Sequence, residues 1–158
     1  MVESLAEQII HKIDQAVQLY YRLILVVAPS GMGKTKALRE VAEHTEYEYT
    51  NINVELSQRL LGLTERQRSL QVFQLLNEIV KKSDVQVVLL DNIELLFDTS
   101  LKQDPLRLLQ AISRNRTVVV SWNGCIEHDH LIYAQPNHPE YRRYSTTDLL
   151  VIGVERQR

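Results

Sequence analysis

The residues best suited to chemistry in this 158-residue chain form a glycine-containing stretch that also carries a lysine and a threonine. It reads Ala28-Pro29-Ser30-Gly31-Met32-Gly33-Lys34-Thr35. Apart from its first residue, it matches the phosphate-binding pattern Walker A: Gly, any four residues, then Gly-Lys-Ser/Thr. Gly31 and Gly33 let backbone N–H groups surround a phosphate without Cβ clashes. Lys34 would reach the β- and γ-phosphates and Thr35 would bind Mg²⁺, so Pro29 to Thr35 are predicted to hold ATP and Mg²⁺.

The stretch departs from the pattern at Ala28, where Walker A has glycine. This replacement costs little if Ala28 keeps an extended backbone. The alternative interpretation is a glycine-containing turn with a surface lysine. An apolar run before the stretch and a helical pattern after it favour the phosphate site, because a helix N-terminus attracts anions.

A second candidate is an acidic residue that ends another apolar run. Val87 to Leu90 are apolar and are followed by Asp91, as in the Walker B pattern. Parallel strands end side by side at their carboxyl edge, so we expect Asp91 to lie beside Thr35 and hold Mg²⁺, directly or through water. An aspartate can also simply end a strand, and the pairing with Walker A is what favours the metal role.

Polar residues also end the strand predicted at 117–121. Ser121 and Asn123 are placed where a side chain could orient the water that attacks the γ-phosphate. The equally simple alternative is that both residues form a turn.

The elements that position these residues alternate between apolar runs and helical periodicity. Near-continuous apolar strands predict a parallel sheet covered on both faces, and right-handed crossovers make it a doubly wound α/β fold with five mainly parallel strands. We expect one domain over residues 1–158, with the helix of residues 1–21 packed on the core. Strands are predicted at 22–27, 47–54, 85–90, 117–121 and 149–154, helices at 3–21, 34–44, 56–63, 69–82 and 106–113, a helical turn at 93–97, and mostly irregular chain at 122–148.

Composition places the chain among ordinary globular domains. It is 44% hydrophobic and 24% charged, with a net charge of −2, which argues against a strongly basic nucleic-acid module. The single cysteine, Cys125, excludes an intrachain disulfide and a multi-cysteine zinc site. Apolar runs are too short to cross a bilayer, and the charged N-terminal stretch does not match a signal peptide, so we expect a cytoplasmic protein.

The separation of Lys34 from Asp91 by a strand and several helices resembles the additional-strand class of P-loop ATPases, which includes the AAA+ proteins. The sequence has neither the Asn-Lys-x-Asp motif of small GTPases nor the Leu-Ser-Gly-Gly-Gln signature of transporter ATPases. The resemblance implies an AAA+-like core. We expect it to lack the C-terminal helical lid, because only four residues follow the last predicted strand.

This class usually has glutamate after the Walker B aspartate, as the base that polarises water. Asn92 stands there in this chain, and an amide cannot accept a proton at neutral pH. Glu94 is the nearest carboxylate. It becomes the candidate base if the chain turns sharply after the strand, and otherwise lies on a helix. Slow turnover and the use of ATP as a switch are therefore both open.

Arginines from a neighbouring subunit often complete such sites. In AAA+ proteins the segment before the last strand commonly supplies one, which here singles out Arg142 and Arg143. Arg114 and Arg116 are the other candidates. The alternative is that all four are solvated surface residues.

Four segments resemble the BrxF family of small P-loop proteins from type 3 BREX phage-defence systems: 88–98, 100–110, 113–117 and 138–144. The resemblance covers nearly the whole chain. It implies a bacterial, cytoplasmic regulatory ATPase that acts with other BREX defence proteins, including a methyltransferase and larger ATPases. A nucleotide-dependent homo-oligomer and contact with DNA, directly or through partners, are further expectations. The alternatives are a non-hydrolysing, ATP-dependent interaction module and a small-molecule kinase.

Overall fold

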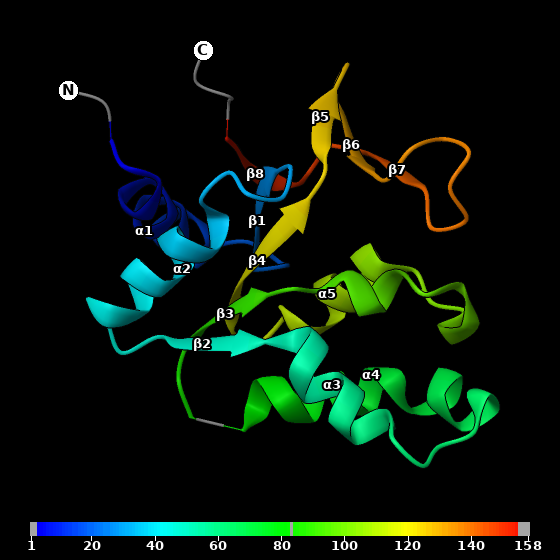
Figure 1. The fold of residues 1–158 in the computed structure, drawn as a ribbon. Helices are drawn as coiled ribbons and strands as arrows, with labels where there is room; N and C mark the ends of the chain where they lie inside the picture. The colour runs from blue at the N-terminus through cyan, green and yellow to red at the C-terminus, as the bar shows by residue number, and fades with distance from the viewer. Residues whose placement is uncertain (1–2, 83, 155–158) are drawn as a thin grey trace.

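The computed structural model describes residues 3–82 and 84–154. Within them, five parallel strands form the central sheet in the order β2-β3-β4-β1-β8 (Figure 1). Their bounds are β1 Leu23–Ala28, β2 Glu48–Asn51, β3 Val87–Asp91, β4 Thr117–Asn123 and β8 Leu150–Gly153. The predicted doubly wound α/β sheet is therefore confirmed, and β4 lies between β1 and β3 as in the additional-strand class.

Helices cover both faces of this sheet, which explains why its central strands β1, β3 and β4 are mostly apolar. Helices α1 (Leu5–Ala16) and α2 (Lys34–Glu43) pack on one face, and α3 (Ile52–Leu60), α4 (Glu65–Lys81) and α5 (Pro105–Ile112) pack on the other (Figure 1). Every residue of β1 and β3 is buried. Alternate residues of β1 enter the two cores, Ile24 and Val26 on the α1–α2 side and Leu25 on the other. No helix within the described residues is both long and apolar enough to cross a bilayer.

Several predicted helix bounds are corrected by the structure. The first helix ends at Ala16 rather than at 21, and Val17 and Tyr20, which lie beyond its end, are 54% and 63% exposed. Helix α4 begins at Glu65 because Thr64 forms a capping box with Gln67. Helix α5 begins at Pro105, and Asp104 before it caps the helix by accepting hydrogen bonds from N–H groups of its first turn.

The prediction of mostly irregular chain at 122–148 is wrong. Three short strands, β5 (Cys125–Glu127), β6 (His130–Tyr133) and β7 (Arg142–Ser145), form an antiparallel sheet there (Figure 1). The β5–β6 hairpin turns through His128 and Asp129, which have φ of 48° and 60°. Neither is the glycine that would have marked a hairpin in the sequence. The small sheet packs on Phe97 and Trp122 through Tyr133 and Tyr144.

Gly124 joins the two sheets at a point where no side chain fits. A Cβ at this position would lie 2.0 Å from the Ile132 carbonyl oxygen and 3.0 Å from Trp122 Nε1. We therefore expect Gly124→Ala to lower the free energy of unfolding by about 1–3 kcal/mol in urea denaturation, through forced backbone shifts. Gly153→Ala is the control, because its Cβ would meet only Ile126 Cδ1 at 3.9 Å. Equal stability of the two variants would contradict this account of the junction.

Candidate functional site

The loop between β1 and α2 has the backbone that its glycines predicted. Gly31 and Gly33 adopt φ of 85° and 90°, and Gly33 stands directly before the first residue of α2. No side chain caps this helix, so its first N–H groups face the loop and can bind an anion. Ala28 is the last residue of β1, where its backbone is extended, and the departure from glycine is tolerated for that reason.

A cavity of about 230 Å³ opens at this loop. It brings together residues from the loop, from the ends of β3 and β4 and from the turn that follows β3. The lining consists of Ser30, Gly31, Gly33, Lys34, Thr35, Lys36, Asp91, Asn92, Glu94 and Asn123. Pro29 and Met32 belong to the same loop but do not line the cavity.

Lys34 is held in this cavity with only 5% of its surface exposed. Its Nζ donates hydrogen bonds to the carbonyl oxygens of Ala28 at 2.7 Å and Pro29 at 2.9 Å. Burial lowers the pKa of Lys34, while the nearby carboxylates of Asp91 and Glu94 act in the opposite direction. An ammonium group has three protons, so one remains to contact a phosphate.

Asp91 ends β3 with its carboxylate directly beside Thr35. Its Oδ2 accepts hydrogen bonds from Thr35 Oγ1 and from the Tyr49 hydroxyl, both at 2.7 Å, and its Oδ1 accepts one from Ser121 Oγ. Burial acts to raise the pKa of Asp91, but these hydroxyls and the Asn92 N–H together lower it below its usual value. A carboxylate and a hydroxyl in this arrangement are ligands suited to Mg²⁺. Tyr49 was not found by sequence reasoning.

A sharp turn after β3 brings Glu94 into the cavity. Asn92 has φ of 54°, a left-handed conformation that asparagine tolerates better than most residues. Glu94 then begins a short 3₁₀ helix, η1 (Glu94–Phe97), which a second one, η2 (Thr99–Leu101), follows. The Glu94 carboxylate accepts one hydrogen bond from the Asn123 amide and one from Asn53 Nδ2 at 3.1 Å. The structure thus brings together Glu94 and Asn123.

The second amide on Glu94 comes from a residue that we had placed inside a strand. Asn53 lies in the first turn of α3, and its Oδ1 also accepts a hydrogen bond from the Leu95 N–H at 2.9 Å. The rule that polar residues at the carboxyl end of a strand enter the site could have found it, had the end of β2 been predicted at Asn51 rather than at 54.

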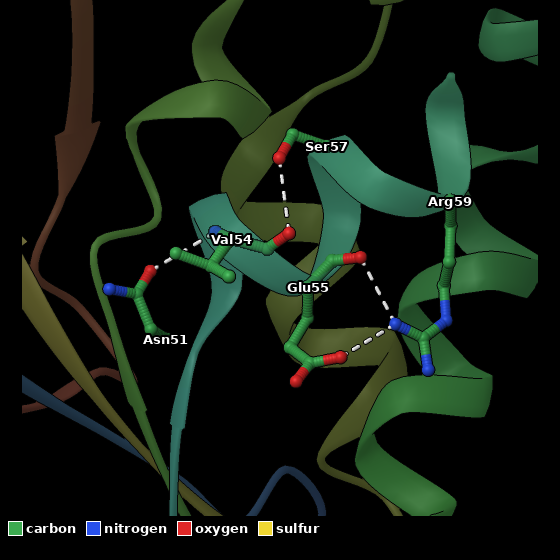
Figure 2. Close-up of polar contacts among 5 residues, drawn as sticks. All are labelled: Asn51, Val54, Glu55, Ser57 and Arg59. Atoms are coloured by element: carbon green, nitrogen blue, oxygen red, sulfur yellow. Dashed lines mark hydrogen bonds and ion pairs between the residues drawn. The ribbon is translucent and has the colours of Figure 1, made fainter. Parts of the chain in front are cut away.

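Figure 2 shows why α3 begins where it does. Asn51, the last residue of β2, accepts a hydrogen bond from the Val54 N–H at 3.2 Å and so caps the helix. Arg59 donates to both the backbone oxygen and the carboxylate of Glu55, one turn earlier. These contacts fix the first turn of α3 and with it the position of Asn53.

The four candidate arginines are not among the described residues that line this cavity. Arg142 donates to the Gln103 carbonyl oxygen at 2.9 Å, whereas Arg143 is exposed on β7 beside His130. Arg114 stacks over the Tyr20 ring at 4.2 Å, and Arg116 donates to the Val80 carbonyl oxygen. Both precede β4 and therefore lie at the end of the sheet opposite the loop.

Comparisons with known proteins agree with this geometry. The sequence profile described as "ATPase family associated with various cellular activities (AAA)" matches residues 24–120, more than half of the chain. Among solved structures, PCH-2 of C. elegans is similar in fold, with a TM-score of 0.50 and 16% sequence identity. The similarity covers 96% of this chain but only 42% of that one. No curated protein sequence matches the chain. The matched segment contains both the phosphate-binding loop and Asp91, and the chain belongs to the AAA family of ATPases.

Proposed function

We propose that this chain binds Mg²⁺-ATP at residues 29–35 and hydrolyses it slowly. The observation that carries the proposal is the meeting of Lys34, Thr35, Asp91 and Glu94 in one cavity at the N-terminus of α2. In this proposal the loop N–H groups and Lys34 bind the phosphates. Thr35 and Asp91 hold the Mg²⁺, which would neutralise charge on the phosphate oxygens.

Glu94 is the group that would accept the proton of the attacking water. The two amide donors, Asn53 and Asn123, hold its carboxylate in place at the cavity. An incoming water must share the Glu94 carboxylate with both amides, and this restricts how readily Glu94 can accept a proton. This restriction supports slow turnover. Asn123, which adjoins both Glu94 and the loop cavity, would orient the water.

We further propose a regulatory role in a type 3 BREX phage-defence system, in the cytoplasm and together with other defence proteins. The support is the resemblance of segments 88–98 and 138–144 to the BrxF family. The first segment contains Asp91 and Glu94, and the second contains Arg142 and Arg143. Adding DNA to a phosphate-release assay of the chain, alone and with partner proteins, tests whether turnover responds to either.

Arg143 is our candidate for completing the site of a neighbouring molecule. It is exposed, whereas Arg142 is tied to Gln103. Because only ATP offers a γ-phosphate, we expect sedimentation to show larger assemblies with ATP than with ADP. Arg143→Ala should abolish this difference while single chains still bind ATP.

Arg114→Ala is the comparison, since Arg114 lies at the opposite end of the sheet. If Arg114→Ala rather than Arg143→Ala loses the assembly, the arginine that completes the neighbouring site lies at the end of the sheet where Arg114 lies. Identical sedimentation with ATP, ADP and no nucleotide would contradict self-association.

A further inference from the structure

Tyr49 contacts the proposed metal site from a strand outside the Walker motifs. It lies on β2, which pairs in parallel with β3 so that Tyr49 is opposite Leu89 and Asn51 is opposite Asp91. Its hydroxyl nevertheless reaches forward to Asp91 Oδ2 at 2.7 Å. The guanidinium of Arg39, on α2, lies over the Tyr49 ring at 4.8 Å from its centre. The ring is thus held between α2 and the sheet, and its hydroxyl points at the carboxylate.

The carboxylate of Asp91 has no spare acceptor position. An ionised carboxylate has about four lone-pair positions. Two donors occupy Oδ2, the hydroxyls of Thr35 and Tyr49, and two occupy Oδ1, the Ser121 hydroxyl and the Asn92 N–H at 3.1 Å. A metal ion or a metal-bound water can therefore reach Asp91 only where one of these donors leaves.

Thr35 is the donor that would leave. Thr35 is exposed at the cavity, and its oxygen is the other proposed Mg²⁺ ligand, so metal binding turns its proton away from Asp91. Ser121 is buried in β4 and the Asn92 donor is a backbone group. The Tyr49 hydroxyl then remains hydrogen-bonded to Asp91 Oδ2. One lone pair of Oδ2 is left open, on the side of Thr35.

We propose that Tyr49 is a positioning residue that limits Asp91 to this single lone pair and so favours a water-bridged Mg²⁺. The inference rests on the proposed Mg²⁺-ATP site. Mg²⁺ keeps several of its waters and demands regular octahedral geometry, whereas Ca²⁺ accepts carboxylates directly in flexible geometries. With Tyr49 in place, one lone pair of Asp91 Oδ2 is open, which suits a bridging water of Mg²⁺; without Tyr49, both lone pairs of Oδ2 are open, which suits direct binding of Ca²⁺.

Tyr49→Phe tests this proposal because it removes one hydroxyl and keeps the ring. ATP affinity is measured by calorimetry at graded Mg²⁺ and, separately, at graded Ca²⁺. We expect the half-saturating Mg²⁺ concentration to rise about tenfold, because the loss of a group that hydrogen-bonds a metal ligand usually weakens metal affinity by at least this much. We also expect the difference in ATP affinity between Mg²⁺ and Ca²⁺ to become smaller. Tyr47→Phe is the matched control, since Tyr47 packs partly buried against the same α1–α2 core.

The outcomes separate this inference from the function on which it rests. Unchanged Mg²⁺ and Ca²⁺ dependence in a Tyr49→Phe protein that melts like wild type would overturn the role of Tyr49 alone. An equal change in Tyr47→Phe would also overturn it, as a general effect on the fold. Failure of the wild-type chain to bind ATP at any metal concentration would instead overturn the proposed function.

Discussion

Glu94→Gln is expected to slow phosphate release by about 10²–10⁴-fold, the usual contribution of a general base. Glutamine has nearly the same size as glutamate and can still accept a hydrogen bond from Asn53 or Asn123, but its amide cannot take a proton from water. ATP affinity should stay close to that of wild type, because Glu94 is not assigned a phosphate or metal contact. Single-turnover phosphate release with saturating Mg²⁺-ATP is the measurement.

Asn92→Gly is a useful companion variant, because Asn92 occupies the position where this class usually has its base and glycine keeps the left-handed backbone of the turn. Its carbonyl oxygen, which accepts from the Asn53 N–H at 2.9 Å, is retained. If phosphate release slows by this amount in the Asn92 variant while Glu94→Gln keeps the wild-type rate, the catalytic role does not belong to Glu94. If wild type binds ATP but releases no phosphate under any condition, the chain is the non-hydrolysing interaction module considered as the alternative.

Lys34→Ala should weaken the binding of Mg²⁺-ATP by more than tenfold. A charge-assisted contact to phosphate contributes about 1.5–3 kcal/mol, and every 1.4 kcal/mol is about a tenfold change in affinity. The variant also removes the lysine donor from the Ala28 and Pro29 carbonyl oxygens, which loosens the loop, although Ala28 keeps the hydrogen bond from the Gly124 N–H. Displacement of a fluorescent ATP analogue provides the affinity.

Lys81→Ala is the control for Lys34→Ala, since Lys81 is exposed at the end of α4, on the other face of the sheet. It should bind Mg²⁺-ATP as wild type does. Equal affinity of wild type, Lys34→Ala and Lys81→Ala would show that the nucleotide binds elsewhere.

The parts of the fold that the sequence predicted are those with local causes. The buried strand β1 and the part of β3 before Asp91 are continuous apolar runs, and the loop after β1 needs glycine at two left-handed positions. Asp91 lies beside Thr35 because parallel strands end at a common edge. Such features follow from a few neighbouring residues and one rule about sheets.

The parts that sequence reasoning missed depend on contacts between distant segments. Asn53 and Tyr49 reach the site because β2 pairs with β3 in one register, and nothing near either residue shows that register. The β5–β6–β7 sheet was missed because its strands are three or four residues long and its hairpin has no glycine. Glu94 was left open because the turn before it depends on a left-handed Asn92, a conformation that asparagine adopts only in some contexts.

Calorimetric titration of the wild-type chain with ATP, in Mg²⁺ and again in EDTA, tests the central claim most directly. The claim is that the cavity at Lys34, Thr35 and Asp91 is a Mg²⁺-ATP site. We predict one ATP bound per chain, with tighter binding in Mg²⁺ than in EDTA, and with binding weakened by more than tenfold in Lys34→Ala. The absence of saturable ATP binding by a folded wild-type chain, or binding that Mg²⁺ does not strengthen, would contradict it.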